Sequence, residues 1–499
     1  MRTVRWLTLI AAGLALALAV GTAVAQDPSN PYYYAPLVPP APDADYDPSE
    51  TAILSRLPDP PAAVPGVAEG PPMPLTIEQQ LAELQRQVDE LKNPKPTPPA
   101  PAKFPNLTVN GVFQADAVLF NQDAANLATF GPIENGADFR RARLSAKGSV
   151  NPTTNYFFQM DFAFFGRPTF TDVWVEWTDI PVLGNVRAGQ WKQPFSLEVV
   201  SSFRYTTFME RSLLFQPFTP FRHIAIGFYD HSEDLNTTWA ASFMRTGQDQ
   251  YGGSISTDGG NGFAGRITHL PYYDECSDGR AYWHIGGAYY LNSPPRDTVR
   301  FRTIPEIFVG ENGAGPVGTS GQAVPGALNG TPFFVDTLPI TGVNAVHTFG
   351  LESLTVLGPF SLQAEAMAAV VDQQANPTAV LGGFYAQAGY FLTGEHRPYD
   401  RAAGAIDRVK PFEDFFWVNT EGGRYFGTGA WEVAARISYL DLTDANINGG
   451  QITDITGGVN WYMNAYTKAV FNYVHSWTDY RSTGFSEANA FGFRVQVDF

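Results

Sequence analysis

One short segment concentrates positive charge in an alternating pattern: Phe139-Arg140-Arg141-Ala142-Arg143-Leu144-Ser145-Ala146-Lys147. In an extended strand alternate side chains share a face. One face therefore carries Arg141, Arg143, Ser145 and Lys147, with Arg140 at the start of the strand. Guanidinium groups offer forked donors that fit oxyanions, and a column of weak sites lets a bound ion move on. The segment predicts a pathway for anions.

A second interpretation of this segment stays open. Arginines on a wall can be paired with acidic residues of neighbouring strands, here Asp161, Asp172 or Glu176. Such pairs would produce a transverse field instead of an anion pathway. The residue types alone do not separate the two interpretations.

Other chemistries have little support in the sequence. Cys276 is the only cysteine, which excludes an internal disulfide and a multi-cysteine metal site. Gly260-x-Gly262-x-x-Gly265 matches a dinucleotide-binding pattern by letter, but no helix follows it to receive a pyrophosphate. The seven histidines lack metal-binding spacing, and His475 and Ser476 point to opposite faces of their strand. We expect no enzyme activity, no cofactor, no metal and no nucleic-acid partner.

The elements that would position the cations are strands. From Phe104 onward apolar and polar residues alternate, for example over Gly111–Phe120 and Trp431–Tyr439. The polar face repeatedly carries full charges, which suits a water-filled interior and an apolar face against lipid, whereas a soluble barrel would turn its apolar face inward. The expected fold class is all-β, a sixteen-stranded antiparallel transmembrane β-barrel. The predicted strands start near Leu107, Phe139, Asn155, Thr171, Asn185, His223, Thr237, Gly262, Ala281, Ala345, Phe360, Val380, Ala430, Ile452, Tyr466 and Ala488.

Composition agrees with a membrane barrel. The 499 residues include 16% charged and 14% aromatic residues, at a mean hydropathy of −0.15. Beyond residue 25 no apolar run reaches the roughly 18 residues that a spanning helix needs. Many aromatic residues without long apolar runs are typical of a barrel in which every second residue faces lipid and aromatic girdles mark the interfaces.

Two connections between the predicted strands are too long to be turns. Lys192–Arg222 follows the fifth strand and is expected to fold inward and narrow the pore. Ser293–Asn344 is rich in glycine and proline and is expected to be an external loop.

The N-terminal part has a different character. Residues 1–25 are predicted to be a secretory signal peptide, with Arg2 and Arg5 before an apolar core and Ala23-Val24-Ala25 as the cleavage site. Residues 26–103 hold nineteen of the 39 prolines. They are therefore expected to form an extended tether. We divide the chain into a signal peptide (1–25), a Pro-rich disordered linker (26–75), a short coiled-coil helix (76–93), a linker (94–103) and the barrel (104–499).

The predicted helix carries a narrow apolar seam at heptad spacing, formed by Ile77, Leu81, Leu84, Val88 and Leu91. A helix of this length is marginal in isolation. One interpretation is a short parallel coiled coil held together by an oligomeric barrel. The other is a single amphipathic helix lying on the barrel or the cell wall.

Five segments, in order along the chain, resemble the phosphate-selective porin O/P family. They are Arg140-Arg141-Ala142-Arg143-Leu144, Gly189-Gln190-Trp191-Lys192-Gln193-Pro194-Phe195-Ser196-Leu197-Glu198, Phe208-Met209-Glu210-Arg211, Gly429-Ala430-Trp431-Glu432-Val433-Ala434-Ala435-Arg436 and Gly457-Gly458-Val459-Asn460-Trp461-Tyr462. The resemblance implies a sixteen-stranded barrel, a homotrimer, an inward loop at the constriction and a coiled-coil extension. It also implies a central anion site at the matching positions, which are Arg140, Arg141, Ser201, Ser202 and Arg211. Lys192 and Arg204 complete the predicted pathway.

The charge balance runs against an anion pore. The chain carries −17, of which the signal peptide contributes +2 and residues 26–103 contribute −6, so the barrel carries −13. Net charge does not say where the acids lie. They could line outer loops, whereas many acids in the lumen would defeat selectivity for phosphate.

We predict an outer-membrane porin for passive diffusion of small hydrophilic solutes, in particular anions such as phosphate, with a periplasmic N-terminal arm. Two alternatives stay open: a general or cation-leaning porin, and an envelope-tethering barrel anchored through that arm. The expected partners are further copies of the chain, outer-membrane lipid, small anions such as phosphate and, through the arm, peptidoglycan or other envelope components.

Overall fold

The computed structural model describes residues 103–163, 168–246, 259–310, 331–420, 423–480 and 484–499. The predicted signal peptide, linkers and coiled-coil helix lie outside the described residues, apart from Lys103. Residues Phe104–Phe499 belong to one compact unit.

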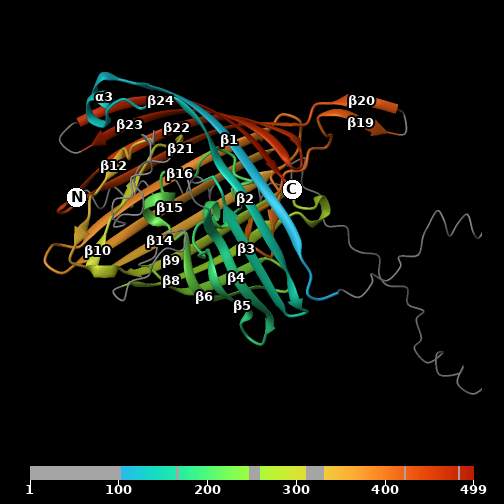
Figure 1. Ribbon diagram of the computed structural model, residues 1–499, viewed down its shortest axis with the longest axis horizontal. Coiled ribbons are helices and arrows are strands. Elements are labelled where there is room, and N and C mark those ends of the chain that lie inside the picture. The colour runs from blue at the N-terminus through green and yellow to red at the C-terminus, as the bar shows by residue number, and fades with distance from the viewer. Residues whose placement is uncertain (1–102, 164–167, 247–258, 311–330, 421–422, 481–483) are drawn as a thin grey trace, which may run out of the picture. The chain divides into compact units, whose positions relative to one another are not determined.

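Sixteen antiparallel strands form a closed barrel in chain order, and β1 pairs with β24 to close it (Figure 1). The barrel strands are β1 (Thr108–Gln122), β2 (Gly136–Asn151), β3 (Thr154–Asp161), β4 (Thr169–Ile180), β5 (Gly184–Lys192), β6 (Arg222–His231), β7 (Thr237–Arg245), β8 (Asn261–Tyr273), β9 (Ala281–Ser293), β14 (Val343–Leu357), β15 (Phe360–Gln373), β16 (Ala379–Phe391), β21 (Ala430–Asp444), β22 (Ile447–Asn464), β23 (Thr467–Tyr480) and β24 (Gly484–Asp498). The predicted fold class and strand number are confirmed, and the predicted starts differ from these by at most five residues.

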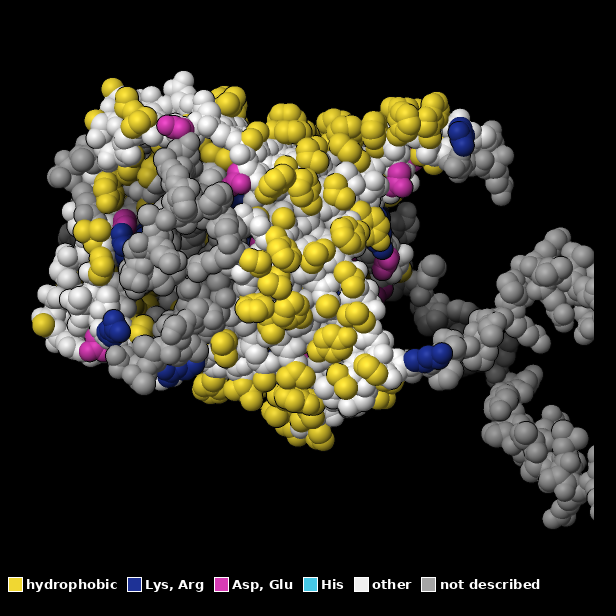
Figure 2. Space-filling view, in the orientation of Figure 1, with side chains coloured by type: hydrophobic (Ala, Val, Ile, Leu, Met, Phe, Trp, Pro, Cys, Tyr) yellow, Lys and Arg dark blue, Asp and Glu magenta, His cyan; other side chains and the backbone are white. Residues whose placement is uncertain are grey.

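The alternation along each strand separates an apolar outer wall from a polar inner wall. In β24, Phe491 is 55% exposed on the outside, whereas Arg494 and Gln496 are each 2% exposed and face inward. Figure 2 shows apolar side chains spread over the visible outer wall. This is the arrangement that contact with lipid requires.

Most connections at one end of the barrel are short, such as Asn151–Thr154 and Leu357–Phe360, and we call this the short-turn end. β1 begins and β24 finishes there. The one long connection at this end, residues 392–429, includes β17 (Tyr399–Asp400), β18 (Ala405–Ile406), β19 (Phe416–Thr420) and β20 (Gly423–Gly427). These four short strands were not predicted from the sequence.

The opposite end, the long-loop end, carries most of the longer connections. Their short elements are α3 (Ala124–Phe130), α4 (Leu197–Val200), α5 (Phe215–Phe218), the 3-10 turn η4 (Pro295–Asp297), β10 (Thr298–Val299), β11 (Arg302–Thr303), β12 (Val335–Asp336) and β13 (Ile340–Thr341). A further 3-10 turn, η3 (Glu275–Ser277), lies at the short-turn end. No helix in the described ranges is long and apolar enough to cross a membrane.

Among the residues that the structure describes, three connections enter the barrel. The first is residues 193–221, which we call the inward loop, and its predicted inward fold is observed: Met209 N donates to Asn472 Oδ1 of β23 (2.7 Å). The second corrects the sequence analysis. Residues 300–309 of the expected external loop insert into the lumen, because Glu306 N donates to Asp454 Oδ2 of β22 (2.8 Å). The third is residues 395–409, which enter from the short-turn end.

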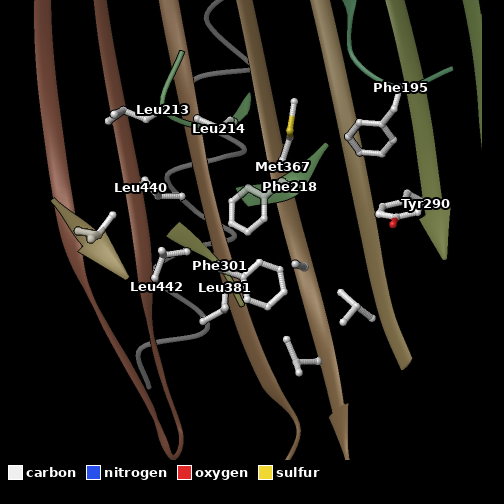
Figure 3. Packing of buried hydrophobic residues seen from close by; sticks show 14 of the residues in the cluster. Phe195, Leu213, Leu214, Phe218, Tyr290, Phe301, Met367, Leu381, Leu440 and Leu442 are labelled. Carbon is white, nitrogen blue, oxygen red and sulfur yellow. The ribbon is translucent and has the colours of Figure 1, made fainter. Parts of the chain in front are cut away.

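The inserted segments form an apolar core with part of the inner wall. Leu213, Leu214 and Phe218 of the inward loop and Phe301 pack against Met367, Leu381, Leu440 and other buried residues (Figure 3). The inner wall of β15, β16 and β21 is therefore apolar near these segments. That part of the lumen is packed with protein.

Candidate functional site

A β-bulge places two adjacent arginines on the inner wall. In the pairing of β1 with β2, Gln114 lies opposite Arg141 and the next residue, Ala115, lies opposite Phe139, so Arg140 has no partner. Phe139 points outward and is exposed, while the side chains of Arg140 and Arg141 both bond to inward-facing groups. A bulge changes the direction in which neighbouring side chains point. Simple alternation would have sent one of the two arginines outward.

The inward loop brings an aromatic ring against the arginines of β2. The guanidinium carbons of Arg141 and Arg143 lie 4.5 and 4.7 Å from the ring centroid of Phe203. Arg204 lies 5.1 Å from the same ring. Cation–π contacts of this kind orient guanidinium groups without neutralising them. The Phe203 ring therefore orients three guanidinium groups without cancelling their positive charge.

Arg141 is the cation of this cluster with spare capacity. It donates from Nη1 to Gln114 Oε1 (2.7 Å) and forms no ion pair within the described part of the chain. Its Nε, like Nη1 of Arg143, is buried, and neither atom has a hydrogen-bond partner among the described residues. A buried donor on a charged group is costly when it is unsatisfied. An oxyanion is the kind of acceptor that such donors lack.

Arg140 is neutralised by the inward loop. Its Nε and Nη2 lie 2.8 and 3.0 Å from the two carboxylate oxygens of Glu210. Glu210 also accepts from Arg494 of β24 (2.8 Å), and Arg494 forms a two-pronged pair with Asp116 of β1. Burial alone would raise the pKa of Glu210, but the attraction of Arg140 and Arg494 lowers it by more. The pKa therefore lies below its ordinary value, and the carboxyl is ionised at neutral pH.

Acidic residues offset the arginines around the bulge. Four arginines (Arg140, Arg141, Arg143 and Arg494) meet four carboxylates, three of them in ion pairs (Asp116, Asp161 and Glu210) and one, Asp138, that interacts with Arg140 and lies opposite Asp116. The sum is zero, whereas the barrel as a whole carries −13. The local balance is what determines the potential that a passing ion meets.

Lys192 and Arg211 stabilise the inward loop. Lys192 Nζ donates to the carbonyl oxygens of Val199, Val200 and Ser201 at 2.7, 3.2 and 2.7 Å, which uses all three of its protons. Arg211 donates from Nε to the Glu198 carbonyl (2.9 Å) and from Nη2 to the Ser201 carbonyl (3.3 Å). Both cations bind the backbone around the end of α4. Most of their hydrogen-bond donors are therefore used within the loop, although the two side chains still add positive charge to the lumen.

The two predicted serines are also engaged in local bonds. The Ser201 hydroxyl accepts from the backbone N–H of Ile406 (3.0 Å), which ties the inward loop to residues 395–409. The Ser202 hydroxyl accepts from Arg204 N (3.4 Å). Arg204 lies 3.5 Å from Asp498, and Lys147 is exposed on β2 at the short-turn side of the cluster. Of the nine predicted residues, Arg140, Arg141, Arg143 and Arg204 gather around Phe203 and Glu210.

The acidic residues do line the inner wall, and most are paired. Of the arginines in the 139–147 segment, Arg143 pairs with Asp161 (2.6 Å), whereas Asp172 and Glu176 pair with other arginines of the wall, Arg222 (2.8 Å) and Arg187 (2.5 Å). On the packed side Glu306 binds Arg436, Ser438 and Thr456, and Arg436 also contacts Glu198 (3.2 Å). Pairing cancels much of the negative charge that the composition places in the barrel.

An open cavity of about 360 Å³ lies between the start of the inward loop, the inner wall of β6–β8 and Ala402–Ala405. Its wall includes small residues such as Gly227, Ala240 and Ser242. Two cations at its edge are already paired, Arg187 with Glu176 and Arg266 with Glu352 (2.6 Å). This cavity gives room for solutes, whereas the spare donors lie at the Phe203 cluster.

Four residues of the site were not predicted from the sequence: Phe203, Glu210, Gln114 and Arg494. Gln114 and Arg494 carried a usable signal, because each lies on the polar face of a predicted strand and the first and last strands of a barrel must pair. Phe203 and Glu210 carried none, since no periodicity relates a loop side chain to a wall.

A model of the family described as phosphate-selective porin O and P matches residues 107–499. The chain belongs to this family. It is therefore an outer-membrane porin, and family membership implies a channel rather than an enzyme. The end of this porin with short turns is the periplasmic one, and the long loops face outward from the cell.

Individual relatives are more distant. The porin is 26% identical over 400 residues to Porin O of Pseudomonas aeruginosa, which covers 74% of this chain and 83% of the relative. It is 24% identical over 349 residues to an uncharacterised protein of Caulobacter vibrioides, covering 68% and 62% of the two chains. Among solved structures, an anion-selective porin from Comamonas acidovorans aligns over 79% of this chain and 99% of its own, with 12% identity and a TM-score of 0.46.

Proposed function

We propose that this porin conducts small anions, phosphate among them, by passive diffusion through weak binding at the Phe203 cluster. The observation that carries the proposal is a pair of buried guanidinium donors on Arg141 and Arg143, which have no hydrogen-bond partner among the described residues and are held against one ring. Oxyanions match such donors in charge and geometry. The description of the family names phosphate selectivity, which supports the same solute class.

The proposed pathway contains the predicted residues in two roles. Arg141, Arg143 and Arg204 would contact the anion, because their guanidinium groups lie against the same ring of Phe203. Arg140, Lys192, Ser201, Ser202 and Arg211 would position the inward loop and contribute charge. Lys147, which is exposed towards the periplasmic end, would attract anions that enter or leave the cluster at that end. No covalent step is involved.

The test is ion selectivity of the purified porin in planar bilayers, with phosphate added as a competitor of chloride current. The wild type should show an anion-directed reversal potential and a chloride current that phosphate reduces. Arg141→Gln should abolish most of the phosphate effect and shift the reversal potential towards cations. Arg245→Gln, which removes an equal charge at the outer end of β7, is the matched control. A cation-directed potential in the wild type would favour the cation-leaning alternative and reject the proposal.

We further propose that the porin is a homotrimer whose periplasmic arm, residues 26–103, follows a cleaved signal peptide (1–25). The heptad seam of residues 76–93 supports an assembly role, since a short coiled coil needs neighbouring copies. Deleting residues 27–103 tests this. Loss of trimers with an intact barrel supports assembly, whereas intact trimers with loss of envelope attachment support binding of peptidoglycan or another envelope component.

A further inference from the structure

The β19–β20 hairpin leaves the barrel at the periplasmic end (Figure 1), and large aromatic side chains on and next to it are exposed. Phe412 is 64% exposed, Phe416 is 52%, and Trp417 and Phe426, which face each other across the two strands, are both 56% exposed. A two-stranded hairpin is marginal in water by itself. A projecting cluster of exposed rings marks a surface that another apolar phase covers.

The base of the hairpin is joined to the aromatic girdle of the outer wall. Phe415 N donates to the carbonyl of Met463 at the end of β22 (2.6 Å), and the Phe415 ring lies 4.6 Å from the ring of Trp461. Trp461 stacks on Trp431 of β21 at 5.1 Å. Both indoles point outward, and both donate from Nε1 to the carbonyl of Thr428, at 2.9 and 3.2 Å.

The surface of the hairpin is thus continuous with the lipid-facing wall. Figure 2 shows the apolar side chains of the wall running without a break onto the projecting hairpin. Tryptophan and tyrosine rings are enriched where a barrel meets the headgroups, because the ring is apolar and its N–H or O–H stays wet. Tyr425 and Arg424, near the tip, add polar groups beside the exposed rings.

We propose that the β19–β20 hairpin docks onto phospholipid, with Trp417 and Phe426 in the interfacial region of the periplasmic leaflet of the outer membrane. Continuity with the wall selects lipid over other occupants, since the Trp431–Trp461 pair at its base already lies on the lipid-facing surface. A second copy of the chain and the periplasmic arm are the competing occupants. The proposal extends the membrane footprint of the porin beyond the ring of barrel strands.

A single reporter thiol tests the proposal in the full-length chain. Cys276, the only cysteine, is exposed and is removed by Cys276→Ser. Trp417→Cys in that background is labelled with a polarity-sensitive fluorophore and reconstituted in vesicles of phosphatidylethanolamine and phosphatidylglycerol. Nitroxide lipids labelled near the headgroup or deep in the chain report contact with lipid, and aqueous iodide reports contact with water.

Two reference positions calibrate the measurement. Thr153→Cys lies in an exposed turn at the same end, and Phe471→Cys lies on the outer face of β23, where Phe471 is 58% exposed. Position 417 should lose most of the iodide quenching seen at 153 and should be quenched by the headgroup nitroxide more than by the deep one. Iodide quenching equal to that at 153, without nitroxide quenching, would overturn the proposal.

The competing occupants give other results, and either overturns it. Protection from iodide without nitroxide quenching, lost when the oligomer is dissociated, means that a second copy covers the hairpin. The same protection lost only on deleting residues 27–103 means that the arm covers it. If Trp417→Cys fails to fold, as judged by heat-modifiable migration, its cross-strand partner Phe426→Cys replaces it and carries the same expectations.

Discussion

Glu210 of the inward loop binds Arg140 of the barrel wall through both carboxylate oxygens, with N–O distances of 2.8 and 3.0 Å. The same carboxylate reaches Arg494 on β24, at the far end of the sequence. One loop residue therefore joins the first and last parts of the barrel and removes one unit of positive charge from the cluster around Phe203. Both effects are testable.

Neutralising this carboxylate should strengthen anion preference. In Glu210→Gln the cluster gains one net positive charge, while an amide can still accept from Arg140. A unit charge at ~7 Å in water is worth about 0.6 kcal/mol, which favours an anion and disfavours a cation by that amount each, so the anion-to-cation permeability ratio should rise about sevenfold. Reversal potentials in a salt gradient measure it. Glu233→Gln, the same charge change in an exposed turn, should leave the ratio near the wild-type value; an equal rise there would assign the effect to net charge alone.

The ring of Phe203 should set the affinity of the cluster. Phe203→Leu keeps an apolar side chain but removes the ring face that orients Arg141 and Arg143. Loss of these contacts is expected to cost about 1 kcal/mol, or about fivefold in the phosphate concentration that halves the chloride current. Phe203→Tyr retains the ring face and should bind phosphate nearly as the wild type does. Equal block in the leucine variant would show that the ring only packs.

Residues 300–309 should behave as a plug anchored by one carboxylate. Glu306 accepts from Leu213 N (3.2 Å) and binds Arg436, Ser438 and Thr456. Glu306→Ala leaves Arg436 with Glu198 as its carboxylate partner and should cost about 3 kcal/mol. We expect larger and noisier single-channel conductance and a lower unfolding temperature in SDS. Asp297→Asn, exposed on the same connection, should change neither; unchanged conductance in Glu306→Ala would mean that the segment stays seated without its carboxylate.

The segment from the periplasmic end depends on a fully buried ion pair. Arg397 binds Glu432, with side-chain exposures of 1% and 0%, and Glu432 also accepts from Asn460 (2.9 Å) and Tyr462 (2.9 Å). Arg397→Met leaves the buried Glu432 carboxylate without its cationic partner and should destabilise the barrel by about 3–5 kcal/mol.

The double variant Arg397→Met with Glu432→Gln should recover much of that loss, because neither charge remains. Unfolding free energies of the two single variants and the double variant give the coupling. Additive losses would contradict a direct pair.

The strand pattern was predictable because each barrel strand shows its two faces in its own residues. Phe491 and Arg494 sort to opposite walls by alternation alone, and Arg141 and Arg143 share a face for the same reason. The bulge at Arg140 was hidden, since its signal is the mismatch between two strands and not a feature of either one. Glycine and proline content marked residues 293–344 as irregular but could not give their direction, and so the predicted external loop was wrong for residues 300–309.

Contacts between the loops and the barrel wall could not be predicted from the sequence, for a different reason. The pairs Glu210–Arg494 and Glu306–Arg436 join residues that are 284 and 130 positions apart, and nothing local specifies such partners. The segment 392–429 lacks any period, so both its entry into the lumen and its exit as a hairpin depend on contacts made elsewhere. These contacts decide how much of the predicted positive column stays available.

The bulge on β2 also determines what a deletion of one codon would do to the pore. Arg140 is the single residue of its stretch without a partner on β1, so its removal would bring Phe139 and Arg141 into consecutive register with Ala115 and Gln114. An in-frame loss of three nucleotides would then subtract one charge from the lumen and leave every flanking strand pair as it was. In a pore wall built in this way, one charge of the lumen can be lost by a single deletion that keeps the pairing of β1 with β2.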